Sequence, residues 1–302
     1  MSDDTDARPL AGQVAIVAGA TRGAGRAIAI ELGAAGATVY ATGRSTRGNP
    51  SPMARAETIE DTAELVDEAG GRGIAVRVDH TSSDDVAALV RRLADEQDGR
   101  LDVLVNDVWG GDPLTEWVPF WQHDLDNGLR IQSNGVHTHL VTSWHAVPLM
   151  LARGRGLIVE ITDGVDARYR GSLFYDLAKA SVIRLALAQA AELREHGIAA
   201  VAVSPGFLRS EAMLDHFGVT EATWRDAIAT DRHFAASETP RFVARGIAAL
   251  AADPDIMRKS GGAFGSWDLG REYGVVDVDG SRPDWGEHFE RVVLPEMGGE
   301  PA

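Results

Sequence analysis

The sequence predicts an α/β fold: a single domain built on a doubly wound parallel sheet. From Gln13 onward, short runs rich in valine, isoleucine and alanine alternate with alanine-rich stretches of helical length. Apolar runs of about six residues, separated by helices, are typical of parallel strands covered on both faces. The runs read QVAIVAGA, ATVYATG, GIAVRVDH, LDVLVND, GLIVEIT and IAAVAVSPG.

Length and composition favour one large domain. The chain has 302 residues, 44% of them hydrophobic and 25% charged, which suits a sizeable core. Residues 1–270 are predicted to form the main domain, and residues 271–302 a carboxyl-terminal extension packed on it. Residues 210–240, rich in Trp, Phe and His, interrupt the alternation. We expect this segment to form a substrate lid, because ligands of open parallel sheets bind beyond the carboxyl ends of the strands.

Composition excludes several classes of function. Cysteine is absent, so disulfides, thiolate catalysis and cysteine-bound zinc are excluded. The formal net charge of −16 opposes binding to nucleic acid. No stretch reaches the roughly 18 uncharged apolar residues of a membrane helix, and the amino end MSDDTDARPL is acidic, unlike a secretory signal. We expect a soluble cytoplasmic protein with no nucleic-acid or membrane partner.

Three histidines, His137, His139 and His145, raise the question of a metal site. Residues two apart do not share a helical face, and no acid in this segment completes a ligand set. We therefore predict packing or surface histidines and no metal.

A glycine-rich turn follows the first predicted strand. In AGATRGAGRAIAIEL, Gly19, Gly23 and Gly25 open a helix. Glycines allow a tight turn and a close approach to a pyrophosphate, and the helix amino end offers free N–H groups and a partial positive charge. Alone, such a turn could serve only to connect a strand to a helix. The sequence of strand, turn and helix favours a dinucleotide site.

The end of the second strand indicates which dinucleotide binds. An NAD site needs an acid there to bind the ribose 2′-OH, but the sequence reads VYATGRS, with Gly43 and Arg44. Arg22, in the glycine turn, could converge with Arg44 on a 2′-phosphate, which guanidinium groups bind well. The alternative is two solvated surface arginines. We favour NADP.

Tyr175 and Lys179 lie four residues apart in FYDLAKAS. On a helix they share one face, where the cation could favour ionisation of a phenol that is otherwise a poor acid or base at neutral pH. Without other motifs, a buried aromatic residue and a surface lysine would be the simpler interpretation.

Several motifs in order give the chain a resemblance to the short-chain dehydrogenase/reductase family over nearly its whole length. Beside the glycine turn and the Tyr175/Lys179 pair, the matching positions are Asp79-His80, Asn106, Asn134 in IQSNGVH, and the segment SPGFLRS. The tail DLGREYGVVDVDGSRP further resembles a branch of animal and bacterial members with an extended carboxyl end. The family's fold is the Rossmann fold predicted above.

The resemblance implies hydride transfer between a nicotinamide and a carbonyl or alcohol carbon, or an imine or amine carbon. Tyr175 would be the acid/base, Lys179 would bind the nicotinamide ribose and lower the pKa of the tyrosine, and Asn134 would hold a proton-relay water. The candidate catalytic residues are Asn134, Asp163, Tyr175 and Lys179. The candidate cofactor-binding residues are Gly19, Thr21, Arg22, Gly23, Gly25, Arg44, Asp79, His80, Asn106, Tyr175, Lys179, Pro205, Gly206, Phe207 and Ser210.

The sequence departs from the family pattern at three places. The segment NDVWG replaces the usual Asn-Asn-Ala-Gly, so Asp107 and Trp109 alter the cofactor pocket. Ser210 stands where threonine is usual. The position of the family's catalytic serine falls on Asp163, with Thr162 before it. Successive strand residues point to opposite faces, so Thr162 could replace the serine only if the strand end bends or the register shifts.

A carboxylate at Asp163 needs an explanation. About 4 Å from a developing alkoxide, it would repel that charge by roughly 4 kcal/mol at an effective dielectric constant near 20. Burial could keep the acid neutral so that it donates a hydrogen bond, or the substrate could be a cation such as an iminium. We favour the neutral acid, because no other feature of the sequence indicates a cationic substrate.

Aromatic residues follow the fourth strand, at Trp109, Trp117, Phe120 and Trp121. They either flank the substrate entrance, which would suit a bulky or apolar small-molecule substrate, or pack a loop against the sheet. Helical segments at about 122–150 and 175–195 correspond to those through which family members commonly form dimers or tetramers. We expect a homodimer or homotetramer.

The sequence thus predicts an NADP-dependent oxidoreductase. A non-catalytic NADP-binding protein is one alternative, because the serine is lost, although Asn134, Tyr175 and Lys179 are retained. A lyase or isomerase that uses Tyr175 and Asp163 as an acid and base is another.

Overall fold

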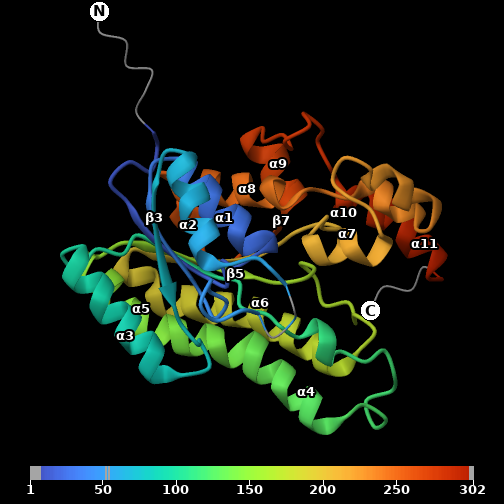
Figure 1. Ribbon diagram of the computed structural model, residues 1–302, viewed down its shortest axis with the longest axis horizontal. Coiled ribbons are helices and arrows are strands. Elements are labelled where there is room, and N and C mark those ends of the chain that lie inside the picture. Colours follow the sequence, from blue (N-terminus) through green and yellow to red (C-terminus); the bar gives the residue numbers. More distant parts are fainter. Residues whose placement is uncertain (1–7, 52, 54, 299–302) are drawn as a thin grey trace, which may run out of the picture.

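A computed structural model describes residues 8–51, 53 and 55–298. Its centre is a seven-stranded parallel sheet in the order β3-β2-β1-β4-β5-β6-β7 (Figure 1). The predicted α/β fold with a doubly wound parallel sheet is confirmed. The strands are β1 Val14–Ala18, β2 Thr38–Gly43, β3 Arg72–Arg77, β4 Val103–Asn106, β5 Gly156–Ile161, β6 Ile198–Ser204 and β7 Ala263–Gly265.

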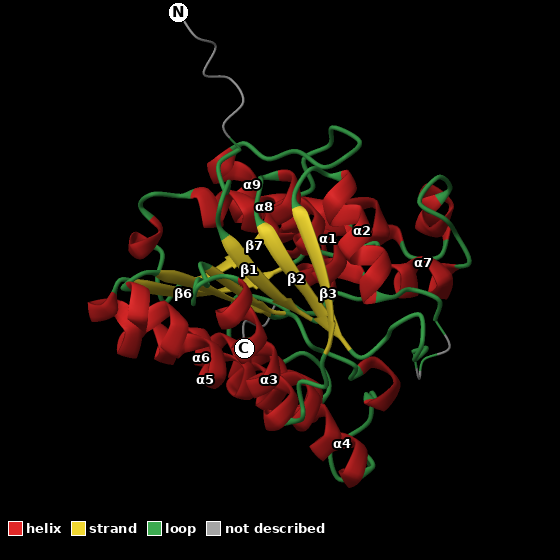
Figure 2. Ribbon diagram, turned by 60° about the vertical axis from the view of Figure 1, so that its left-hand side comes forward, coloured by secondary structure: helices red, strands yellow, loops and turns green. Residues whose placement is uncertain are grey.

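Helices cover both faces of the sheet (Figure 2). One face carries α1 (Gly23–Ala34), α2 (Ile59–Glu68) and α8 (Pro240–Ala252), and the other carries α3 (Ser83–Glu96), α5 (Thr138–Arg153) and α6 (Leu173–Leu193). Alternate strand residues serve the two layers: Ala15 and Val17 of β1 belong to the core beneath α1 and α8, whereas Val14 and Ile16 belong to the core beneath α3 and α5. This double burial explains why the central strands are apolar along most of their length.

Two parts of the fold differ from the prediction. The seventh strand, β7, has only three residues, so it leaves no apolar run that could be recognised. The segment expected to be one helix over 122–150 is α4 (Leu125–Gln132), a π-helical turn (Ser133–His137) and α5. Each residue of such a turn has ordinary helical dihedral angles, so local sequence preferences do not reveal it.

The segment after β6 forms α7 (Glu211–Phe217) and two 3₁₀ turns, Trp224–Ala229 and Arg232–Ala236. Its core is aromatic, with Phe234 fully buried at 4.7 Å from the Phe217 ring. The tail continues through α9 (Ser266–Tyr273), α10 (Trp285–His288), a π-helical turn (Phe289–Val293) and α11 (Leu294–Glu296). Three further 3₁₀ turns are Asp112–Leu114, Arg194–His196 and Ile256–Arg258.

The tail packs on this segment. The Trp285 ring lies 5.5 Å from that of Phe207, and His233 Nδ1 and His288 Nε2 are 3.0 Å apart. In Figure 1, α10 and α11 lie beside α7. Among the described residues, no helix combines the length and apolar character needed to cross a membrane.

Candidate active site

The glycine turn is built so that only glycine fits. Gly19 has a φ of +93°, and a Cβ there would lie 2.5 Å from the carbonyl oxygen of Asp107. A Cβ on Gly25 would lie 2.4 Å from the carbonyl oxygen of Gly19. The N–H groups of Gly19 and Ala20 both donate to the Thr42 carbonyl, which ties the turn to the end of β2. The turn therefore brings the amino end of α1 beside the carboxyl ends of β1, β2 and β4.

The amino end of α1 accommodates an anionic oxygen. Gly23, its first residue, donates its backbone N–H to Glu211 Oε2 at 2.9 Å. A carboxylate oxygen and a phosphate oxygen both accept a hydrogen bond from such an N–H group. The glycine turn thus fits the pyrophosphate of a nicotinamide dinucleotide, which would be held by Gly23 and the turn before it.

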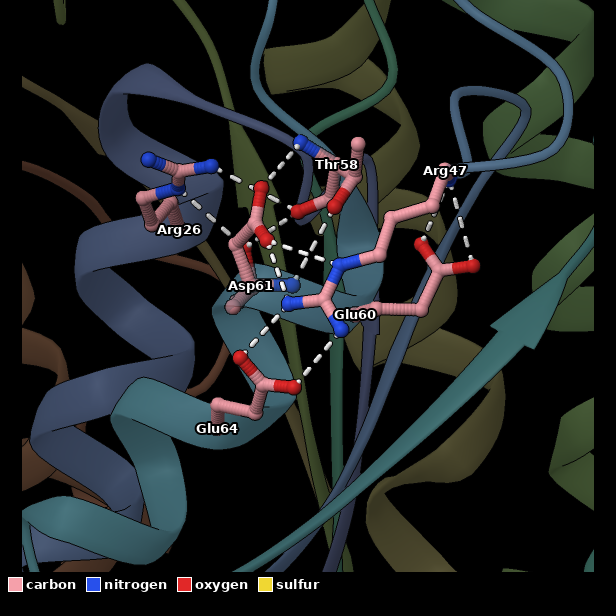
Figure 3. A network of polar contacts seen from close by, with 7 residues as sticks. Arg26, Arg47, Thr58, Glu60, Asp61 and Glu64 are labelled. Carbon is pink, nitrogen blue, oxygen red and sulfur yellow. Dashed lines mark hydrogen bonds and ion pairs between the residues drawn. The ribbon is translucent and has the colours of Figure 1, made fainter.

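Three arginines lie near the ends of β1 and β2, and they differ in how closely carboxylates approach their guanidinium groups. Arg47 is held by α2: its guanidinium lies 2.7 Å from Asp61 and 2.6 Å from Glu64, and its N–H donates to Glu60 (Figure 3). Arg44 is half exposed, and its nearest carboxylate, Asp79, is 3.9 Å away. The charge of Arg44 is therefore less neutralised than that of Arg47.

Arg22, the third arginine, turns toward the segment before α2. Its Nη2 donates to Ser51 Oγ at 3.0 Å. The end of β2 has no room for an acid at Gly43, because a Cβ there would lie 2.7 Å from Thr21 Oγ1 and 3.2 Å from Ile59. The missing strand-end acid is thus a consequence of packing against the buried Thr21.

The side chains of His80 and Asn106 are buried and make their hydrogen bonds within the core. The imidazole of His80 lies between the hydroxyls of Thr42, at 2.9 Å, and Thr142, at 2.8 Å, and burial lowers its pKa to about 4. Asn106 is fully buried and donates to Ser143 and Glu160. If either residue contacts a cofactor, it must do so through its backbone. Asp79 remains partly exposed: burial raises its pKa, but the hydrogen bonds from Thr81 together with the charges of Arg44 and His80 lower it by more.

A buried pair of hydrogen-bonded side chains lies beneath the site and was not predicted. His139 Nδ1 is 2.7 Å from Glu160 Oε2, both side chains are at most 3% exposed, and Gln189 also donates to Glu160. The other ring nitrogen of His139 lies 3.1 Å from the carbonyl oxygen of Val108, beside Trp109. The pair thus braces the loop that departs from the family pattern. The sequence feature that could have indicated this pair is Glu160, a charged residue within the apolar run GLIVEIT.

The other two histidines lie in different environments. His145 bonds to Ser83 at 2.8 Å, and His137 is exposed. No group of three potential ligands suited to a metal ion occurs in the described part of the chain.

The hydroxyl of Tyr175 contacts Asp163 and not Thr162. The Tyr175 hydroxyl donates to Asp163 Oδ2 at 2.9 Å. Thr162 is buried and donates to the carbonyl oxygen of Lys179 at 2.8 Å. These two residues, which follow the end of β5, thus direct their side chains to different partners. The Asp163 side chain is 49% exposed, so the burial required by the neutral-acid hypothesis is not found.

The electrostatics around Tyr175 differ from the expectation that Lys179 lowers its pKa. Burial and the neighbouring Asp163 carboxylate raise the pKa of Tyr175. Burial in turn lowers the pKa of Lys179, whose Nζ lies 3.9 Å from the centre of the Trp109 ring and 5.6 Å from that of Tyr175. In this arrangement the phenol is held in its protonated form, with a carboxylate as acceptor.

The remaining candidates surround this pair. Asn134 lies in the π-helical turn between α4 and α5, a type of irregularity that is frequent at functional sites. Burial raises the pKa of Asp107, beside Gly25, to about 7. Pro205, Gly206 and Phe207 follow β6, and Ser210 caps α7 by accepting from the Met213 N–H at 3.3 Å.

The aromatic residues divide into two pairs. Trp109 and Trp117 flank Tyr175, with ring centres 5.4 and 5.7 Å from its own. Phe120 and Trp121 contact each other at 5.3 Å and are 53% and 71% exposed. The first pair lies where a substrate entrance was expected, and the second is not packed against the sheet.

Comparisons with known proteins agree with this geometry. The family model for short chain dehydrogenases matches residues 13–217. Mouse dehydrogenase/reductase SDR family member 1 is 36% identical over 90% of this chain and 85% of its own length. A short chain dehydrogenase structure from Mycobacterium thermoresistibile superposes with a TM-score of 0.75 over 92% of both chains, at 25% identity.

Another similar structure is a putative NAD(P) dependent gluconate 5-dehydrogenase from Beutenbergia cavernae with bound NADP. It gives a TM-score of 0.68 at 25% identity, over 87% of this chain and 98% of its own. These matches show that the chain is a hydride-transfer oxidoreductase that uses a nicotinamide cofactor. The chain belongs to the short-chain dehydrogenase/reductase family.

Proposed function

We propose that this protein is an NADPH-dependent reductase of a carbonyl compound in which Tyr175 donates the proton. The observation that carries the proposal is the Tyr175 hydroxyl, which lies between Trp109 and Trp117 and is kept protonated by its environment. A nicotinamide dinucleotide held at the glycine turn would supply the hydride for the carbonyl carbon, and the Tyr175 phenol would donate the proton to the oxygen. The raised pKa keeps the phenol protonated, as reduction requires, and it also makes the phenol a weaker acid than an ordinary tyrosine.

NADP is favoured over NAD by the end of β2. Gly43 leaves no room for an acid that would bind the ribose 2′-OH, and Arg44 offers a partly free guanidinium. The Beutenbergia cavernae protein has NADP bound. On this proposal Arg44 binds the 2′-phosphate, with Arg22 and Ser51 close to the same rim.

An imine or iminium substrate is the second candidate, and exposure of Asp163 supports it. A partly exposed carboxylate 2.9 Å from the proton donor would attract a cation and repel a developing alkoxide. Solvent screening reduces both effects, so the site also tolerates a neutral ketone. The aromatic walls suit a bulky apolar body in either case.

We further propose that the protein assembles through α5 and α6. Their outer surfaces carry large apolar side chains that are 40–74% exposed, which is costly for a monomer. These residues are Leu140, Trp144, Leu151, Leu177 and Leu187. Light scattering at micromolar concentration should give a dimer or tetramer, and a monomer would contradict the proposal.

NADPH oxidation with a panel of ketones and cyclic imines tests the main proposal. Wild-type protein should oxidise NADPH with at least one class, and Tyr175→Phe should lose turnover while keeping its NADPH affinity, because the phenol acts on the substrate. Retained turnover in Tyr175→Phe would remove Tyr175 from the mechanism. A preference for imines that Asp163→Asn abolishes would favour the second candidate.

A further inference from the structure

The helix α7 reaches the glycine turn through a carboxylate. Glu211, its first residue, is half-buried and accepts the 2.9 Å hydrogen bond from the backbone N–H of Gly23. The two residues are 188 positions apart in the sequence, so only the tertiary fold brings them together.

The N–H group of Gly23 is one that a dinucleotide needs. In the first turn of a helix that follows a glycine turn, free N–H groups bind the oxygens of a pyrophosphate. One hydrogen cannot serve two strong acceptors, and two anions at the same helix end repel each other. The Glu211 carboxylate and a bound pyrophosphate therefore compete for this end of α1.

A second carboxylate of α7 makes a parallel contact. Asp215 Oδ2 lies 2.7 Å from Arg55 Nη1, in the segment before α2. Residues four apart share one face of a helix, so Glu211 and Asp215 both direct α7 toward the nucleotide side of the sheet. The helix begins directly after Ser210, a candidate cofactor-binding residue that caps it.

We infer that Glu211 is a latch that holds α7 on the cofactor site and lowers the affinity for the dinucleotide. Arrival of the pyrophosphate displaces the carboxylate from Gly23, which frees α7 from its hydrogen bond to α1. The lid and the cofactor site are thereby coupled. This inference rests on the proposed binding of the dinucleotide at the glycine turn.

Equilibrium titration of the full-length protein with NADPH, followed by nicotinamide fluorescence, tests the latch. Glu211→Gln removes the charge and keeps the shape, and Glu211→Ala removes the acceptor as well. Both variants should bind NADPH about tenfold more tightly, which is the order expected for loss of a hydrogen bond to a charged acceptor. Asp226→Asn removes one charge from an exposed position of the same lid and should leave the affinity unchanged.

NADH and 2′-AMP separate the latch from the choice of cofactor. Both dinucleotides contain the pyrophosphate, so the gain must appear with NADH as well as NADPH. Tighter binding of NADH than NADPH by the wild type would overturn the proposed cofactor and leave the latch intact. Adenosine 2′-monophosphate lacks a pyrophosphate, and its affinity should not change. Unchanged dinucleotide affinity in both Glu211 variants, or an equal gain in Asp226→Asn, would overturn the latch.

Discussion

The Tyr175 hydroxyl donates its hydrogen bond to Asp163 Oδ2, 2.9 Å away, rather than to a neutral hydroxyl. A carboxylate acceptor stabilises the protonated phenol and opposes its ionisation, so together with burial it raises the pKa of Tyr175. Arg170 Nε, 4.0 Å from the same oxygen, offsets part of this charge. Tyr175 is therefore protonated at neutral pH, and its raised pKa makes it a weaker acid than an ordinary phenol.

Asp163→Asn should make alcohol oxidation possible at lower pH. Oxidation needs the ionised phenol as base, and removal of the carboxylate charge lowers the pKa of Tyr175 toward its ordinary value. The half-exposed position of Asp163 screens the effect, so we expect the alkaline rise of kcat/KM for oxidation to move down by about one pH unit. The measurement is a pH profile with NADP and an alcohol that corresponds to an accepted ketone.

Thr162→Val is the matched control for that profile. Its hydroxyl donates to the Lys179 carbonyl and not to Tyr175, so its loss should lower the free energy of unfolding by about 1 kcal/mol without moving the profile. If Thr162→Val abolishes turnover while Asp163→Asn changes neither activity nor profile, Thr162 takes the place of the catalytic hydroxyl.

Arg44→Asp should reverse the cofactor preference. The new carboxylate would repel a 2′-phosphate and could accept the 2′-OH of NADH, which changes the ratio of the two affinities by about a hundredfold or more. Arg47→Ala is the control, because Arg47 is neutralised by Asp61 and Glu64, and it should preserve the order of affinities. Equal affinity of the wild type for NADPH and NADH would contradict the NADP proposal.

The strands and the motifs could be predicted because local sequence carries them. Buried parallel strands are apolar along their whole length, and a glycine turn must be glycine wherever a Cβ would clash, as at Gly19. The three-residue β7 and the π-helical turn around Asn134 have no comparable local signature.

The polar partners within the site could not be predicted, because they depend on long-range packing. Glu160 stood out as a charge in an apolar strand, but only the fold shows that His139 faces it. The exposure of Asp163 depends on the loop that follows β5, whereas the sequence favoured the neutral acid because it gave no sign of a cationic substrate. The hydrogen bond between Gly23 and Glu211 joins two segments that are distant in the sequence, and nothing in either segment indicates that the two residues meet.

His80 should make the fold less stable as the pH falls below 6.5. Its pKa is about 4 in the folded protein, because the ring is buried between Thr42 and Thr142, and about 6.5 in the unfolded chain. Between these values the unfolded state binds more protons, so stability is full above pH 6.5 and is lost as the pH falls toward 4. From pH 7 to pH 5 this one group should cost about 2 kcal/mol.

Urea unfolding of the wild type and His80→Gln at pH 7 and pH 5 isolates this contribution. The glutamine variant cannot take up the proton, so although it is less stable at pH 7 it should lose about 2 kcal/mol less than the wild type on acidification. His137→Gln, at an exposed histidine of the same half of the fold, should follow the wild type at both pH values. Because carboxylates titrate alike in all three proteins, the difference between them reports His80. Parallel losses in the wild type and His80→Gln would show that His80 does not remain neutral in the folded protein.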